Sequence, residues 1–232
     1  MSQRFAASGI LKHSRIDLMD LITTKRLSAN RKVDRAAWLA IREICCRTGD
    51  NGRAIARQRW DFFARVWIDP YEKLLPEWTY VAMRDESIVG YLTGCPDSRK
   101  FNRAKFWRAD LPLLTRIAVG RYRHDSGARQ FARRAIGFGK RAEQHFSPAL
   151  HQTLIRSYPA HLHVNVDESY RRAGIGRRLI ESYFTDLRRR GVTGVHLFCG
   201  GDPVKFYQRL NFQVLETAPS RNTTVFVLGQ RL

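Results

Sequence analysis

The chain has 232 residues, of which 44% are hydrophobic and 11% aromatic, so it can bury a sizeable core and is not a wholly disordered chain. No stretch approaches the roughly 20 apolar residues that span a bilayer, and no signal-peptide run opens the sequence, so we expect a cytoplasmic protein with no membrane partner. Lys and Arg number 41 against 21 Asp and Glu, a net charge of +20 that attracts polyanions or only keeps the surface soluble.

The four cysteines, Cys45, Cys46, Cys95 and Cys199, argue against a metal centre. They form no CxxC pair, and no histidine stands at zinc-ligand spacing from them. We therefore expect no metal, and thiols that stay reduced.

The N-terminal part predicts a tail followed by helices. Residues 1–33 are basic and rich in Ser and Ala, which is typical of a mobile tail. Asp34 is an N-cap residue, and apolar side chains over 37–45 recur at helical spacing until Gly49 ends the pattern. A second helix is predicted over 52–66.

Two strands follow, joined by a polar turn. Residues 78–83 and 87–93 are rich in apolar and β-branched side chains, and 84–87 reads Arg-Asp-Glu-Ser. This arrangement predicts an antiparallel hairpin.

Residues 98–159 lack strand signals and are too long for a plain loop, so we expect an insertion within a single domain over 34–232. Residues 99–147 hold 13 basic and three acidic residues, half of the net charge of the chain. The best helix candidates are 101–107 and 128–146. A basic insertion predicts association with a polyanion, nucleic acid included, or a solvated surface.

The C-terminal part alternates strands with helices. The alternation of Leu162, Val164 and Val166 predicts a strand, and a long amphipathic helix ends at Arg190. The remaining predicted elements are a strand over 195–199, a helix over 202–210, and strands over 212–216 and 223–228.

The turn between the first of these strands and the long helix has the composition of an anion site. Gly174 and Gly176 remove side chains where a phosphate must approach the backbone, and a helix N-terminus presents unpaired N–H groups. A dinucleotide fingerprint lacks its first glycine here, and a Walker loop lacks its Gly-Lys-Ser/Thr. The glycines could also serve only to shape a tight turn.

Arg171-Arg-Ala-Gly-Ile-Gly176 fits the R/Q-x-x-G-x-G/A signature of the GNAT acetyltransferases, and Phe206 to Phe212 resembles the F-Y-x-x-x-G-F element of that family. The resemblance implies an α/β (α+β) GNAT acyl-CoA N-acyltransferase fold, with a mixed, mostly antiparallel central sheet flanked by helices. Segments 48–50, 90–97, 158–163 and 194–197 further resemble bacterial relatives of the acetyltransferase-like domain of O-GlcNAcase.

The sequence departs from the family pattern at three places. Asn211 stands where the family usually has Gly, and 200–205 is shorter than the usual approach to Phe-Tyr. Asn165 stands where many relatives of the subgroup have Asp. The last two departures favour an alternative in which the protein binds acetyl-CoA with little turnover.

The resemblance implies acetyl-CoA as the acyl donor, with its pyrophosphate on the main-chain amides of 171–176 and its pantetheine arm along the preceding strand. The residues expected to bind it are Val164, Asn165, Val166, Arg171, Arg172, Ala173, Gly174, Ile175, Gly176, Arg177, Phe206 and Tyr207.

The family reaction is direct attack of an amine on the thioester. The resemblance implies that Tyr207 is the general acid that reprotonates the leaving thiolate. His163 and Asp97 are the candidate catalytic bases that we retain, with Asp167 and Glu168 as further carboxylates. We therefore expect an N-acetyltransferase that acts on an amine of a small molecule, peptide or protein lysine. The alternatives are an acetyl-CoA-binding scaffold module and a nucleic-acid-associated protein.

Overall fold

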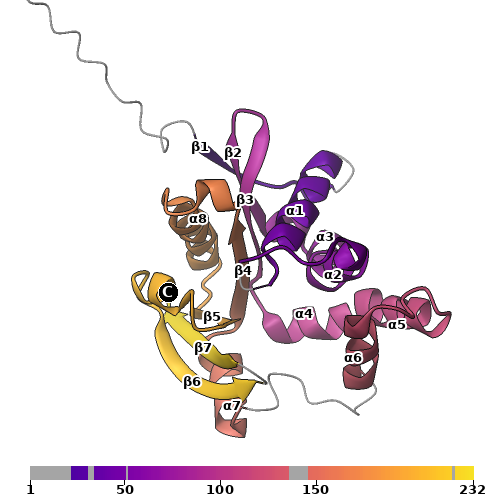
Figure 1. The fold of residues 1–232 in the computed structure, drawn as a ribbon. Coiled ribbons are helices and arrows are strands. Elements are labelled where there is room, and N and C mark those ends of the chain that lie inside the picture. Colours follow the sequence, from indigo (N-terminus) through magenta and orange to yellow (C-terminus); the bar gives the residue numbers. More distant parts are fainter. Residues whose placement is uncertain (1–21, 31–33, 51, 136–145, 221–222) are drawn as a thin grey trace, which may run out of the picture.

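The computed structural model describes residues 22–30, 34–50, 52–135, 146–220 and 223–232 (Figure 1). The described residues form a seven-stranded sheet with the order β1-β2-β3-β4-β5-β7-β6. Its strands are β1 (Ile22–Arg26), β2 (Thr79–Arg84), β3 (Ser87–Cys95), β4 (Ala160–Val166), β5 (Gly194–Cys199), β6 (Gln213–Ser220) and β7 (Thr223–Arg231).

Helices occupy most of the remaining described chain. The α-helices are α1 (Arg35–Thr48), α2 (Trp60–Trp67), α3 (Asp69–Leu74), α4 (Ser98–Lys105), α5 (Leu111–Ala118), α6 (Ser126–Ala135), α7 (Pro148–Ser157), α8 (Ile175–Arg189) and α9 (Val204–Gln208). Short 3₁₀ turns are η1 (Arg57–Arg59), η2 (Pro76–Trp78) and η5 (Glu168–Tyr170), and a π-helical turn, η3 (Phe106–Asp110), joins α4 to α5.

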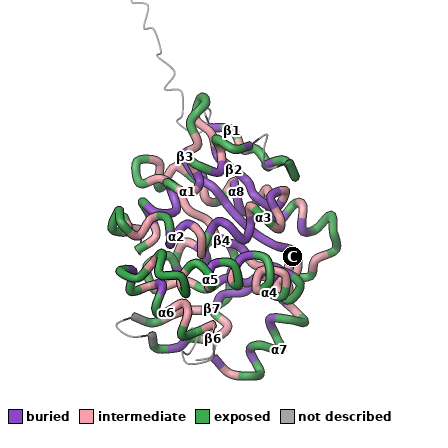
Figure 2. Tube along the Cα trace, turned by 90° about the vertical axis from the view of Figure 1, so that its right-hand side faces the viewer, coloured by how far each residue is buried: buried purple, intermediate pink, exposed green. Residues whose placement is uncertain are grey.

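The sheet is covered on both faces, and the alternation of side chains along its strands decides which core each one joins. Tyr80 and Ala82 of β2 face the apolar stripe of α8, whereas Val81, between them, packs with Trp38 and Ile41 of α1. In Figure 2 the buried residues follow the strands and α8, and the outer surfaces of α5 and α6 are largely exposed.

The middle of the sheet opens between β4 and β5. These strands are parallel, and they pair only at Ala160 with Val195 and at His161 with His196. Each strand then stays paired to its outer neighbour, β4 with β3 as far as Val166 and β5 with β7 as far as Cys199. Since both outer pairings continue while the central one stops, the two strands separate like the arms of a V.

The described helices within residues 98–135 are anchored by apolar contacts and do not form a loose basic loop. Leu113 of α5 and Ala128 of α6 pack on Phe62 of α2, and Phe101 of α4 packs on Tyr71 of α3. The α6 helix corresponds to the start of the helix predicted over 128–146, whose residues 136–145 lie outside the described part of the chain.

Three sequence expectations need correction. Residues 22–26, expected in a mobile tail, form edge strand β1, because Ile22 and Leu27 bury their side chains while β1 pairs with β2. The helix expected over 52–66 begins later than predicted, because the first residues of this range are irregular and η1 at Arg57–Arg59 leads into α2 at Trp60. Helix α9 is shorter than predicted, with Pro203 and not Asp202 at its N-cap.

Candidate functional site

The turn after β4 carries a row of unpaired amides. Gly174 and Arg172 both have positive φ values, 71° and 66°, and α8 begins at Ile175. The first amide of this helix to reach a backbone acceptor is that of Arg178, which donates to Gly174. The N–H groups of residues 172–177 meet no acceptor within the described chain. Together with the positive end of the helix dipole, these amides are suited to bind an anion beside the open arm of the V.

Arg171 supports this turn and does not contribute to the row of free amides. Its backbone N–H donates to Glu168, and its guanidinium donates to the carbonyl of Gly52 at 2.8 Å. A second contact comes from α1, where the Arg47 guanidinium forms an ion pair with the carboxylate of Asp167 at 3.1 Å. The sequence-based expectation that Arg171 offers its amide to the ligand therefore does not fit this geometry.

Phe206 and Tyr207 of α9 lie against the start of α8. A Cβ on Gly176 would approach the Phe206 ring to 3.0 Å, so glycine permits this packing. The Tyr207 ring is buried between Phe206 and Phe212, at centroid distances of 5.0 and 5.5 Å. Its hydroxyl makes no hydrogen bond to any described residue. Burial, reinforced by Cys199, raises the pKa of Tyr207 above its ordinary value and keeps the phenol protonated.

His163 lies on the face of β4 that points away from α8. Its ring stacks on Trp67, with centroids 5.6 Å apart, and its Nε2 lies 3.0 Å from the amide nitrogen of Asn165. That same nitrogen donates to the Tyr91 hydroxyl at 2.9 Å. Burial lowers the pKa of His163 to about 4, so the imidazole is neutral at physiological pH. Trp67 was missed from the sequence, because no motif surrounds it.

The candidate carboxylates are held by local structure. Asp97 is the N-cap of α4 and accepts from the amide of Lys100 at 3.0 Å, at the end of β4 where the V is closed. Asp167 accepts from the amide of Ser169 and pairs with Arg47. Glu168 is exposed. Of the four sequence candidates for the base, the structure thus places His163 within the V on the face opposite α8.

Val164 and Val166 face the other way and pack against the α8 core. Their backbone lies on the arm of the V that has lost its partner strand, as expected for a strand that pairs with a ligand. Within the described residues, no group of three or more His, Cys, Asp or Glu side chains could hold a metal ion, and no helix is long and apolar enough to cross a membrane.

Comparison with known families gives this arrangement a name. Residues 131–214 match the family model described as "Acetyltransferase (GNAT) domain". This segment of the chain is therefore similar to a GNAT acetyltransferase domain. The matched segment includes β4, the glycine turn, α8, β5 and α9, which together contain the open V and its anion site.

Solved structures confirm the GNAT fold over nearly the whole chain. The crystal structure of SsHAT is 27% identical, with a TM-score of 0.67, over 90% of this chain and 98% of that one. PH1933 from Pyrococcus horikoshii OT3 is 14% identical, with a TM-score of 0.56 and coverages of 91% and 98%. A GCN5-related N-acetyltransferase from Kribbella flavida is 15% identical, with a TM-score of 0.51 and coverages of 92% and 99%.

The backbone geometry explains one departure from the GNAT sequence pattern. Asn211, which replaces the usual glycine after Phe-Tyr, has a φ of 66°. Asn is among the few residues other than Gly that adopt this left-handed region readily, so the turn is kept without glycine.

Three histidines around the closed end of the V should make the domain sensitive to acid. Burial lowers the pKa of His161 to about 3 and that of His163 to about 4, and it also lowers the pKa of His196. The unfolded chain, with histidine pKa values near 6.5, binds these protons more readily than the folded one. Stability is therefore complete above about pH 6.5 and falls as the pH drops toward 4.

We expect His161 and His163 together to cost about 3 kcal/mol of unfolding free energy between pH 7 and pH 5. Urea unfolding at a series of pH values measures how steeply the free energy of unfolding falls as the pH drops. The variant His161→Gln should make this slope shallower, whereas His124→Gln, at an exposed surface position, should not. Equal slopes in all three proteins would contradict the assignment.

Proposed function

We propose that the protein transfers the acetyl group of acetyl-CoA to an amine of its acceptor. The observation that carries this proposal is the row of unpaired amides at residues 172–177, at the open end of a V from which a neighbouring strand is missing. Such a site matches a pyrophosphate joined to an extended, hydrogen-bonding arm.

In this proposal, the amides of residues 172–177 hold the pyrophosphate, with Arg172 and Arg177 adding positive charge. The backbone of Val164, Asn165 and Val166 pairs with the pantetheine arm, and Phe206 borders the start of α8. Acetyl-CoA supplies the thioester whose carbonyl carbon the amine attacks, and the C–S bond breaks as the C–N bond forms.

Tyr207 donates its hydroxyl proton to the departing thiolate. The hydroxyl is free of hydrogen bonds within the described residues, and its raised pKa keeps the proton in place until the thiolate forms. His163 takes up the proton lost by the amine, directly or through water. Asp97 remains assigned to capping α4, since its carboxylate is already engaged with Lys100.

A second inference concerns the subgroup. We infer a relationship to the bacterial relatives of the acetyltransferase-like domain of O-GlcNAcase. It is supported by the position of two resembling segments, 90–97 and 158–163, which form the paired region of β3 and the beginning of β4 beside the site. The acceptor in this proposal is an amine of a small molecule, peptide or protein lysine.

The direct test is release of CoA thiol from acetyl-CoA in the presence of a panel of amines. Thiol release that depends on both the protein and an amine supports acetyl transfer. Binding of acetyl-CoA without amine-dependent release indicates a binding module instead. Absence of acetyl-CoA binding in titration calorimetry, at both low and moderate salt, would overturn the proposal.

Asn165 gives a sharper test of the role of His163. In Asn165→Asp a carboxylate replaces the amide whose nitrogen lies 3.0 Å from the imidazole, and an opposite charge at this range raises a histidine pKa by about 1–3 units. We expect an acid limb to enter the kcat/KM profile of the variant between about pH 5 and pH 7.

The profile is best measured as the ratio of variant to wild-type rates at each pH, which cancels titration of the acceptor amine. Adding His163→Gln to the variant should abolish the new limb. A limb that survives in the double variant would show that another group titrates.

A further inference from the structure

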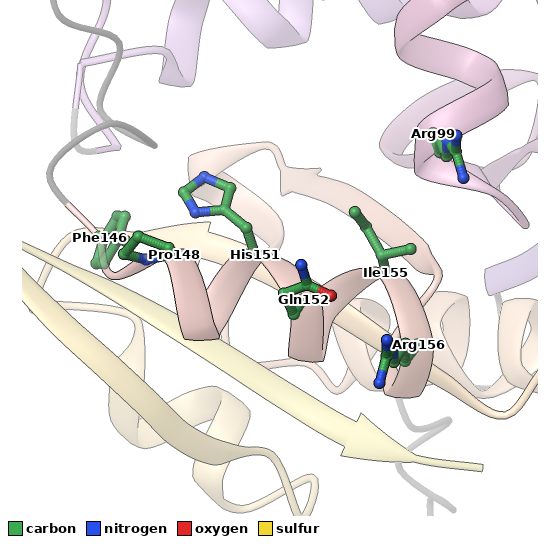
Figure 3. Close-up of a pocket in the computed structure, with 7 residues that line it drawn as sticks. All are labelled: Arg99, Phe146, Pro148, His151, Gln152, Ile155 and Arg156. Carbon is green, nitrogen blue, oxygen red and sulfur yellow. The ribbon is translucent and has the colours of Figure 1, made fainter.

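A pocket of about 800 Å³ opens between α4 and α7 (Figure 3). In the figure, Arg99 on α4 lies across from a row of side chains on α7. The lining residues that matter here are Arg99, Phe146, His151, Gln152, Ile155 and Arg156.

The pocket adjoins the closed end of the V on the face away from α8. A chain of ring contacts leads to it from β4. His161 lies 5.9 Å from His196, His196 lies 5.8 Å from Phe198, and Phe198 lies 5.7 Å from Phe146 in the pocket wall. This is the face of β4 that carries His163.

The opposite wall of the pocket, formed by α4, also begins beside His161. Ser98, the first residue of α4, places its hydroxyl 2.7 Å from Nδ1 of His161 and donates to the carbonyl of Pro159. Arg99 is the next residue. Both walls of the pocket therefore begin where β4 and β5 separate, and an acceptor that reaches the thioester from this face would extend into the pocket.

Among the described residues, the charged side chains that line the pocket are positive. Arg99 and Arg156 are exposed and form no ion pair with any described acidic residue, and no carboxylate lines the pocket. The acid near His151 is Glu216, but its two oxygens accept from the backbone N–H and hydroxyl of Ser147, at 2.8 and 2.6 Å. Two guanidinium groups without such an ion pair match a carboxylate in charge, and a guanidinium can bind a carboxylate through two hydrogen bonds.

The pocket is also partly apolar. Ile155 is 54% exposed, an unusual value for a large aliphatic side chain, and Phe146 forms the adjacent wall. An aliphatic segment between the amine and the acid of an acceptor would cover these side chains and remove them from water.

We propose that this pocket binds a carboxylate of the acceptor, so that the preferred substrate carries an acidic group a few bonds or residues away from its reacting amine. The proposal rests on the proposed acetyl transfer and specifies its substrate class. Both a peptide lysine with glutamate neighbours and a small ω-amino acid have this chemistry.

The test uses two matched pairs of acceptors. One pair is a short lysine peptide flanked by glutamates and the same peptide flanked by glutamines, and the other is 6-aminohexanoate and its amide. We expect kcat/KM to favour the acidic member, about tenfold for each arginine that contacts the carboxylate. A preference in only one pair shows whether the acid is recognised in a peptide or in a small molecule.

The matched variants are Arg99→Gln/Arg156→Gln and, as a control, Arg108→Gln/Arg116→Gln. The control pair is exposed elsewhere on the insertion and removes the same charge. We expect the first variant to lose the preference through a higher KM, with the neutral acceptors unaffected, and the control to keep it. The Kd for acetyl-CoA, measured by calorimetry on each protein, should stay within about twofold, because the cofactor phosphates bind elsewhere.

Failure of this proposal is separable from failure of the proposed function. If the wild type acetylates acidic and neutral acceptors equally well, the pocket proposal is wrong and acetyl transfer stands. If no acceptor is turned over, calorimetric titration with the glutamate peptide still tests whether the pocket binds a carboxylate. Equal Kd values for Arg99→Gln/Arg156→Gln and its control would then overturn it.

Discussion

Replacing Tyr207 with phenylalanine should lower kcat by about 10²- to 10³-fold while leaving the affinity for acetyl-CoA within about twofold. The hydroxyl has no hydrogen-bond partner in the described structure, so its removal breaks no internal hydrogen bond. The ring contacts with Phe206 and Phe212 remain in the variant. Only the proton offered to the leaving thiolate is lost.

Thiol release measures kcat, and titration calorimetry with acetyl-CoA measures binding in the same preparation. Thermal unfolding of the variant serves as the control for packing. A variant with unchanged kcat would remove Tyr207 from proton transfer and leave it as a core residue. A large loss of acetyl-CoA affinity would instead place the hydroxyl in cofactor binding.

Substituting valine for Gly174 or Gly176 should weaken acetyl-CoA binding by about 100-fold or more. Gly174 has a φ of 71°, a conformation that a β-branched residue avoids, so the turn must change its path. At Gly176 the new Cβ would lie 3.0 Å from the Phe206 ring and displace either α9 or the start of α8. Either change misaligns several charge-assisted hydrogen bonds, each of which contributes about 1.5–3 kcal/mol.

Gly120→Val is the matched control for backbone strain. Gly120 also has a positive φ, 80°, but a Cβ at this position would meet no described atom within 4 Å. The Gly120 variant should lose stability similarly to Gly174→Val and keep its Kd for acetyl-CoA. Unchanged Kd values in both Gly174→Val and Gly176→Val would show that the turn only connects β4 to α8.

The parts of the site that could be predicted from sequence are the local ones. The glycine turn is flanked by an alternating strand and a long periodic helix, and all three signals lie within about 30 residues. The hairpin of β2 and β3 was equally readable from its polar turn. In each case the alternation of apolar side chains and the residues that the turn requires lie within one short stretch of sequence, so a local pattern is enough to predict the element.

The surroundings of His163 could not be predicted in the same way. Its partner Asn165 is two residues away, but Tyr91 and Trp67 reach it only because β3 pairs with β4 and α2 packs over that face. The N-cap role of Asp97 was not predicted, because the helix was expected to start at residue 101 and α4 starts at Ser98. The unpaired arm of β4 depends on where β5 ends its pairing, which no local pattern encodes.

Short or weakly apolar elements were also missed. Strand β1 is an edge strand with polar residues after Ile22, so it resembles a charged tail. Helix α7 buries only Leu150 and Leu154, and its remaining surface forms the pocket wall. Such elements acquire their place from the rest of the fold more than from their own pattern.

The V between β4 and β5 gives the sheet two additional edges in its interior. An exposed edge is a template for pairing with a further strand, and most proteins protect such edges with charges, bulges or cover. Here the free edge of β4 leads into the turn that carries Arg172, so a segment of another chain that paired with it would lie beside positive charge. In the proposed complex, the pantetheine arm would pair with the β4 edge. The amides of β4 beyond His161 that point toward β5 should therefore exchange with deuterium quickly in the free protein and become protected when acetyl-CoA is present.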